Sequence, residues 1–226
     1  DLSNANNVHL VDLRIRGFSN GVYIREFGGS GATNNLVRNC IFVSNMAANV
    51  KMLGVKIISN RIAGCSIDGK NRASYGIQIT DGDRNLMTNN TIRGHTLNGI
   101  DIGGSGASNR IVGNAVRSNA FDGIAIAGAA AVGNQIISNV IDGTGITYQD
   151  YGVVLQADRN VVVNNIIRGH SQSGVYIPGP TGNSSNLVAG NSIWSNVLIG
   201  VNIVGTAADG NRIVSNNFDG MNSQDT

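Results

Sequence analysis

The sequence predicts an all-β fold, a parallel β-helix in which short strands stack coil upon coil. Three observations predict it: the composition, a repeat of about 25 residues, and apolar columns within that repeat. The chain holds 31 Gly and 32 Asn among 226 residues, but one Glu and three Lys. Because helices favour Ala, Leu, Glu and Lys, this composition excludes helical bundles, coiled coils and doubly wound α/β folds. An apolar content of 41% argues against a disordered chain.

The repeat covers essentially the whole chain in nine copies. Each copy reads Asn, four residues, Asn, one residue and then an apolar residue, as in "RNLMTNNTIRGH" and "SNRIVGNAVRSN". We take the second Asn as the anchor, and the nine anchors, the first of them a leucine, are Leu13, Asn39, Asn60, Asn90, Asn114, Asn139, Asn165, Asn191 and Asn216. A strand repeated at this period cannot bury its inner face alone, so the coils must stack at about 4.8 Å per coil.

Apolar columns on both sides of the anchor predict the first two strands of each coil. Three residues before the anchor stand Leu10, Leu36, Ile57, Met87, Ile111, Ile136, Val162, Val188 and Ile213. Two residues after it stand Ile15, Ile41, Ile62, Ile92, Val116, Ile141, Ile167, Ile193 and Phe218. Alternation at a period of two residues predicts that these side chains point inward while their neighbours point outward.

A third strand follows about nine residues after the anchor, as Gly, apolar, any residue, apolar. Its glycines are Gly21, Gly76, Gly99, Gly123, Gly152, Gly174 and Gly200, and Asn49 takes this place in the second coil. Gly allows the backbone to turn with positive φ, and Asn tolerates the same conformation. Stacked Asn side chains also bond to each other, so the Asn excess indicates turn structure rather than substrate binding.

Three coils form a longer unit of about 76 residues, since "IRGHTLNGIDI" at 92 recurs as "IRGHSQSGVYI" at 167. We interpret the chain as one domain, residues 1–226, built by tandem duplication. The sequence starts without an initiator Met or signal peptide, so we expect a segment of a longer protein. We also expect flanking domains or oligomer contacts to cover the ends of the stack.

These coils resemble the parallel β-helix repeat proteins of the pectin-lyase-like superfamily. The resemblance implies a right-handed helix with three parallel sheets, and an extracellular, cell-surface or periplasmic location. Members of the superfamily include pectate and alginate lyases, alginate epimerases, polygalacturonases and phage tailspikes. The "DPHD"-type motif of epimerases and the hydrolase and lyase motifs are absent here, so no catalytic residue is carried over.

Charge and hydropathy exclude two further classes of function. A formal net charge of +2 provides no basic stripe for nucleic acid. No apolar run approaches the roughly 20 residues of a membrane span.

Outward columns are where a ligand would bind, because the inward ones form the core. Three residues after the anchor stand Arg16, Phe42, Ala63, Arg93, Arg117, Asp142, Arg168, Trp194 and Asp219. Within this column Arg93, Arg117, Asp142, Arg168 and Trp194 form a continuous strip that suits an acidic polysaccharide, because guanidinium groups fork onto carboxylates and Trp stacks on sugars. The alternative is a solvated row in which Asp142 neutralises its two Arg neighbours.

A second outward column follows the third strand: Tyr23, Lys51, Gln78, Asp101, Ala125, Val154, Tyr176 and Asn202. Asp101 is a candidate general acid or base, and Lys51, Tyr23 and Tyr176 are further catalytic candidates beside a uronate. No second carboxylate faces Asp101 in this column, which weakens a hydrolase mechanism.

The histidines, the turn aspartates and the cysteines do not form a predicted metal site. His95 and His170 share one column three coils apart, too far to share a metal, and a turn-packing role is expected for both. Asp81, Asp83 and Asp158 stand in turns where calcium binding is an alternative to turn chemistry. We predict no cofactor and no metal. Cys40 and Cys65 either pair or stay free.

Two longer segments, 63–74 and 143–150, are predicted insertions where function would concentrate. The sequence thus predicts an extracellular β-helix that binds, and cleaves or epimerises, an acidic polysaccharide. The alternative is a non-catalytic structural or adhesin β-helix.

Overall fold

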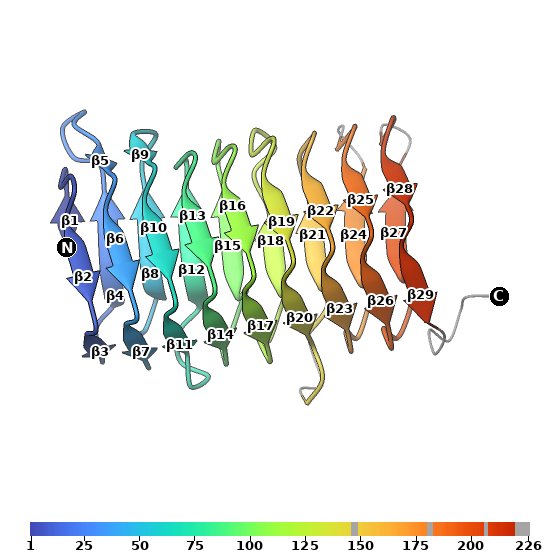
Figure 1. The fold of residues 1–226 in the computed structure, drawn as a ribbon, viewed down its shortest axis with the longest axis horizontal. Helices are drawn as coiled ribbons and strands as arrows, with labels where there is room; N and C mark the ends of the chain where they lie inside the picture. Colours follow the sequence, from blue (N-terminus) through green and yellow to red (C-terminus); the bar gives the residue numbers. More distant parts are fainter. Residues whose placement is uncertain (146–148, 180–182, 206–207, 220–226) are drawn as a thin grey trace.

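The computed structural model describes residues 1–145, 149–179, 183–205 and 208–219, in which every regular element is a β-strand. Three nine-stranded parallel sheets run side by side along one axis, and each coil gives one strand to each sheet (Figure 1). The predicted all-β parallel solenoid of nine coils is therefore confirmed. Within the described part of the chain, no helix is long and apolar enough to cross a membrane.

The three sheets are named A, B and C. Sheet A comprises β1 (Leu2–Ser3), β4 (Asn20–Arg25), β8 (Ala48–Leu53), β12 (Tyr75–Thr80), β15 (Ile100–Gly103), β18 (Ile124–Ile126), β21 (Val153–Leu155), β24 (Val175–Pro178) and β27 (Val201–Val204). Sheet B comprises β2 (His9–Val11), β6 (Leu36–Arg38), β10 (Arg61–Ala63), β13 (Leu86–Thr88), β16 (Arg110–Val112), β19 (Gln135–Ile137), β22 (Val161–Val163), β25 (Leu187–Ala189) and β28 (Arg212–Val214). Sheet C comprises β3 (Arg14–Arg16), β7 (Ile41–Val43), β11 (Ser66–Asp68), β14 (Thr91–Arg93), β17 (Ala115–Arg117), β20 (Val140–Asp142), β23 (Ile166–Arg168), β26 (Ser192–Trp194) and β29 (Asn217–Asp219). A short pair, β5 (Ala32–Thr33) and β9 (Ile57–Ile58), flanks them.

The core lies between the three sheets and is built by β-branched side chains in register. Ile102 of β15, for example, pairs with Ile79 of β12 and Ile126 of β18, and all three are fully buried. The strands are only two to six residues long, so a coil gains its stability from the coils above and below it. Because the coils stack in register, outward side chains of neighbouring coils lie one strand spacing apart, about 4.8 Å.

The second coil differs from the prediction by one residue. Val37, not Leu36, pairs with Leu10 and fills the inward column of sheet B. Phe42, predicted to point outward, is fully buried, whereas Ile41, predicted to point inward, is 44% exposed. The anchor position is therefore occupied by Cys40, and the exposed Asn39 before it only resembles an anchor.

The third coil differs by five residues. Ile62, predicted for the second strand, lies in β10 of sheet B and pairs with Val37. Cys65 takes the anchor place, and Asn60 belongs to a different corner of the coil. Ile57, predicted for the first strand, is buried in β9 outside the main sheets. Ala63 lies in β10, so it is not part of the predicted outward column of sheet C.

Asparagines at two corners of the coil bond from one coil to the next. At the corner between sheets A and B they are Asn35, Asn60, Asn85, Asn109, Asn134, Asn160, Asn186 and Asn211. At the corner between sheets B and C they are Asn90, Asn114, Asn139, Asn165, Asn191 and Asn216. The N–H of Asn90, for instance, donates to Asn114 Oδ1 over 2.9 Å, and its Nδ2 donates to the Ile62 carbonyl over 3.0 Å. Buried turn backbone is thereby satisfied.

The third corner, between sheets C and A, carries the two histidines. Nδ1 of His95 donates to Asn119 Oδ1 over 2.8 Å, and Nδ1 of His170 donates to Asn196 Oδ1 over 2.7 Å. Both rings are fully buried, and burial lowers the pKa of each histidine to about 4. The prediction that these histidines pack a turn is confirmed.

Candidate functional site

The outer face of sheet A carries the predicted second outward column. In-register pairing aligns Tyr23, Lys51, Gln78, Asp101, Ala125, Val154, Tyr176 and Asn202. The register agrees with the sequence analysis at every position, although Ala125 and Val154 are buried, and a role in catalysis or binding stays a prediction. Six strand spacings of about 4.8 Å separate Tyr23 from Tyr176, so the column is roughly 29 Å long.

One end of this column is cationic and aromatic. The Lys51 ammonium lies 5.8 Å from the centre of the Tyr23 ring, and the Arg25 guanidinium lies 5.2 Å from the same ring. Arg25 also pairs with the Asp1 carboxylate at 2.9 Å. Cations held over an aromatic ring suit a sugar that carries a carboxylate.

One amide links the side chain of Asp101 to the backbone of Asp122 near the middle of sheet A. Nδ2 of Asn98 donates to Asp101 Oδ1 over 2.9 Å, while Oδ1 of Asn98 accepts the N–H of Asp122 over 3.1 Å. Asn98 itself is only 8% exposed, so the bridge is fixed by packing. We call Tyr75, Asn98, Asp101, Asp122 and Tyr151 the Asp101 centre.

Both acids of the Asp101 centre have raised pKa values. Burial raises the pKa of Asp122 to about 7, a value that also includes a lowering by a hydrogen bond from the Tyr151 backbone and a raising by the nearby carboxylates of Asp150 and Asp101. Oδ1 of Asp122 is buried and has no hydrogen-bond partner. Burial also raises the pKa of Asp101, although Asn98 and Gln78 counteract this effect. A carboxyl group that holds its proton near neutral pH, next to a second acid with a raised pKa, is typical of acid–base chemistry.

Tyrosines border the same two acids. The rings of Tyr151 and Tyr176 stack with their centres 4.5 Å apart and their planes 13° apart. Burial and the Asp101 carboxylate raise the pKa of Tyr75, which places this hydroxyl in the field of that acid. A flat aromatic surface beside carboxyl groups is a common arrangement where sugars bind.

The predicted catalytic candidates do not form one centre. Tyr23 and Lys51 are neighbours, but Gln78 separates Lys51 from Asp101, and Tyr176 lies three strands beyond Asp101. Sequence reasoning missed Asp122, because this residue stands at the corner before Gly123 and not in the outward column. The only sequence signal was an acidic residue at a position where other coils carry Tyr75 or Asn98.

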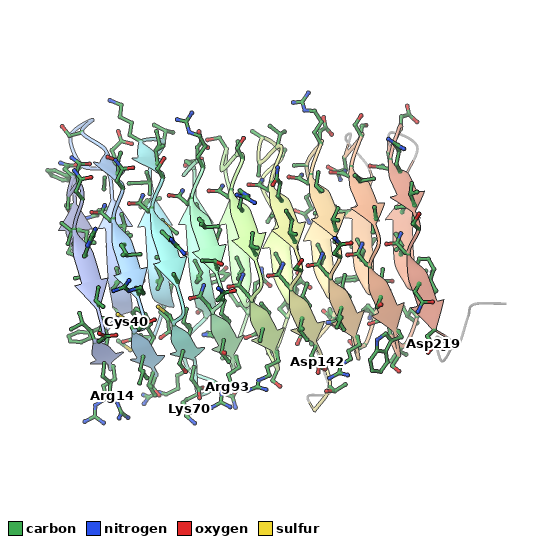
Figure 2. The ribbon with its side chains drawn as sticks, viewed as in Figure 1. Arg14, Cys40, Lys70, Arg93, Asp142 and Asp219 are labelled. Atoms are coloured by element: carbon green, nitrogen blue, oxygen red, sulfur yellow. The ribbon has the colours of Figure 1, made fainter. Side chains whose placement is uncertain are left out.

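The predicted strip on sheet C is also in register. Arg93 pairs with Arg117, Arg117 with Asp142, Asp142 with Arg168, and Arg168 with Trp194. In coils two and three the column continues as Val43 and Asp68, in place of the predicted Phe42 and Ala63. Figure 2 shows Arg93, Asp142 and Asp219 along this edge of the molecule.

Opposite charges neutralise each other along much of this strip. Arg93 pairs with Asp68 at 2.9 Å and Arg168 with Asp142 at 2.7 Å, and the Arg168 guanidinium covers the Trp194 ring at 4.8 Å. Burial alone would raise the pKa of Asp142, but hydrogen bonds from Thr144 and the Arg168 charge outweigh it and hold that pKa below its usual range. Among the described residues, Arg117 forms no ion pair.

The insertion in the third coil lies beside the strip. It follows Asp68 and is shorter than the predicted 63–74, since β10 and β11 occupy the first part of that range. This segment projects beyond the sheet C edge in Figure 1. With Arg93 it forms an open basin of about 340 Å³ lined by Asp68, Lys70, Asn71, Gly94 and Ser118. In the second insertion, residues 146–148, including Tyr148, lie outside the described residues.

The acidic turns bond to backbone. Asp81 Oδ1 accepts the N–H of Ser105 and Asp83 Oδ1 that of Ala107, both over 2.8 Å, and Asp158 Oδ1 accepts that of Ser184 over 2.7 Å. In the part of the chain that the structure describes, no group of three or more His, Cys, Asp or Glu side chains could hold a metal ion. These contacts give the three aspartates a turn-forming role.

The fold and the sequence can be compared with known proteins. Residues 1–155 match the family model described as "Right handed beta helix region". The chain belongs to this right-handed β-helix family. No curated protein sequence matches it.

Solved structures share the fold at low sequence identity. The periplasmic alginate epimerase AlgG is 16% identical with a TM-score of 0.72, over 88% of this chain and 55% of that chain. The A-module of the Azotobacter vinelandii mannuronan C-5 epimerase AlgE4 is 15% identical with a TM-score of 0.75, over 95% and 60%. An alginate lyase from Paenibacillus is 14% identical with a TM-score of 0.62, over 97% of both chains. The chain thus spans between half and two thirds of the two epimerases.

Proposed function

We propose that the protein acts outside the cytoplasm, binds an acidic polysaccharide along the outer face of sheet A, and cleaves or epimerises it at the Asp101 centre. The bridge from Asp101 through Asn98 to Asp122 supports this function most strongly. It ties the Asp101 carboxyl group to the corner that carries Asp122, and the burial of each acid raises its pKa.

The chemistry follows from the two acids. With a pKa of about 7, Asp122 is partly protonated near neutral pH and can donate its proton to a glycosidic oxygen. Asp101 is the second carboxyl group that hydrolysis requires, or the base that takes the proton next to a uronate carboxylate. Which bond is broken depends on the group that the sugar places beside Asp101.

Subsites on both sides of this centre account for binding. Lys51 and Arg25 attract the carboxylates of the polysaccharide at one end, and the Tyr151–Tyr176 stack contacts a sugar face at the other. The alginate epimerases and the alginate lyase that share this fold lend support to a polyuronate substrate. AlgG is a periplasmic enzyme, which supports a location outside the cytoplasm for this protein.

The strip of Arg93, Arg117, Asp142, Arg168 and Trp194 is proposed as a secondary contact for the same polyanion. Asp68 and Asp142 already satisfy two of its arginines, which leaves Arg117 as the group open to a carboxylate. We therefore expect this strip to add less to binding than sheet A does.

Incubation with alginate, polygalacturonate and a neutral glucan tests the proposal. Ultraviolet absorbance detects an unsaturated lyase product, a reducing-end assay detects hydrolysis, and proton NMR detects inversion at C5. Product is expected from wild-type protein and the control Arg110→Gln on sheet B, but not from Asp101→Asn or Asp122→Asn. Retardation in affinity gels without any product would favour the alternative, a non-catalytic structural or adhesin β-helix. If the protein forms no product and is not retarded, the proposal is overturned.

A further inference from the structure

Two cysteines interrupt the asparagine stack at the corner between sheets B and C. From Asn90 onward every anchor position is an asparagine, whereas the second and third coils carry Cys40 and Cys65. The N–H of Cys65 donates to Asn90 Oδ1 over 2.9 Å. Cys65 has no side-chain oxygen with which to accept the N–H of Cys40 in turn. Coils two and three therefore lack the asparagine amide that links the later coils at this corner, and the Cys65 thiol stands beside Cys40 in its place.

The same two cysteines lie on adjacent coils in register. Strands β7 and β11, which follow them, pair residue by residue, and the N–H of Ser66 donates to the Cys40 carbonyl over 2.9 Å. Neighbouring strands are about 4.8 Å apart, within the Cα separation of roughly 4.4–6.8 Å that disulfides span. Both thiols take the same orientation, with Cys40 Sγ 3.3 Å from the Arg38 carbonyl and Cys65 Sγ 3.5 Å from the Ala63 carbonyl.

We propose that Cys40 and Cys65 form a disulfide that joins coils two and three in place of the missing asparagine link. The oxidant is a small-molecule disulfide such as oxidised glutathione. The thiolate of one cysteine attacks it to form a mixed disulfide and releases one reduced thiol. The second cysteine then attacks the mixed disulfide and releases the other, so that the two cysteines lose two hydrogens in all.

Burial determines when this bond forms. Cys40 is fully buried and Cys65 is 2% exposed, so an oxidant reaches neither thiol in the closed fold. Burial also raises the pKa of Cys65 to about 11, which leaves little reactive thiolate at neutral pH. The disulfide is thus expected to form during folding, or when the first coils open. This inference does not depend on the polysaccharide proposal.

Refolding of the full chain tests the disulfide. The protein is unfolded in denaturant and refolded with a mixture of reduced and oxidised glutathione, and in parallel with reductant alone. After denaturing alkylation, the oxidised sample should be a monomer lighter by two hydrogens, carry no alkyl group, and yield one peptide pair that contains Cys40 and Cys65. Closing a loop of this length should raise the Tm by roughly 5–10 °C over the reduced sample.

Variants control for other effects of the redox buffer. Cys40→Ala with Cys65→Ala removes both thiols, and its Tm should not respond to glutathione. Full alkylation of both thiols after oxidising refolding would overturn the proposal, as would glutathione adducts or intermolecular dimers as the only products. If the variant does not fold, the masses and peptides of the wild-type protein decide the question by themselves.

Discussion

Sheets A and C carry polar side chains at the same spacing, yet their electrostatics are opposite. On sheet C, neighbouring coils place Asp68 beside Arg93 and Asp142 beside Arg168, and the ion pairs neutralise both acids. On sheet A, Asp101 and Asp122 come from neighbouring coils and form no ion pair among the described residues, and burial raises the pKa of both. An acid therefore stabilises the fold where register places a cation one coil away, and stays reactive where it is buried without one.

Catalysis should show the largest difference between the two faces. Asp122→Asn removes the proposed acid on sheet A without changing its shape, and should lower kcat on a polyuronate at least about 100-fold, the usual contribution of acid–base catalysis. Steady-state kinetics of product formation measures it, with Arg110→Gln on sheet B as the control. A kcat within twofold of wild type would show that Asp122 does not take part.

Stability should change in opposite directions at the two faces. The folded-state pKa of Asp122 is raised, so the stability from its protonated form is present below the ordinary Asp pKa and is lost as pH rises through about 7. Asp122→Asn should therefore raise the free energy of unfolding by about 2 kcal/mol at pH 8, and change it little at pH 4.

Asp142→Asn should change the free energy of unfolding in the opposite direction. The pKa of Asp142 is lowered by Thr144 and Arg168 despite its burial, so its contribution is present above the ordinary Asp pKa and is lost in acid. We expect the free energy of unfolding to fall by only about 1 kcal/mol at pH 8, because the Asp142–Arg168 pair is partly exposed to solvent. Urea denaturation of both variants at pH 4 and 8 measures this. The same sign at pH 8 for both would remove the electrostatic distinction between the faces.

Polyuronate binding should differ between the two faces by a smaller amount than catalysis or stability does. Tyr176→Ala removes half of the aromatic stack on sheet A and should weaken polyuronate binding about 5-fold. Arg117→Gln on sheet C should weaken it about 2-fold, and less at high salt. Affinity electrophoresis at two salt concentrations compares them. A larger loss for Arg117→Gln would make the strip, and not sheet A, the main binding face.

Most of the fold could be predicted from the sequence because each coil buries its apolar side chains and bonds its turns in the same way. Seven of nine copies show an asparagine or leucine at the true anchor, and the outward column of sheet A was placed correctly throughout. The errors fall where Cys40 and Cys65 replace the anchor asparagine. There the sequence pattern wrongly predicts Asn39 and Asn60 as anchors, because residue type alone does not show which side chain bonds to the next coil.

The Asp101 centre was only half predictable. Asp101 stands in a visible outward column, but Asp122 owes its raised pKa to burial among side chains from other coils. Tyr151 and Asp150 reach it from the following coil, after an insertion that interrupts the repeat. Period and spacing in one sequence do not report how such a corner packs, so neither this burial nor its effect on acidity could be derived beforehand.

Chemical-shift mapping tests the central claim, that substrate lies along sheet A, most directly. A short oligouronate is titrated into isotope-labelled Asp122→Asn protein, which should bind without turning it over, and amide shifts are followed by NMR. We predict that the largest changes fall on β12, β15, β18, β21 and β24, on both sides of Asp101. Changes confined to β14, β17, β20 and β23 of sheet C, or no changes at all, would contradict the account.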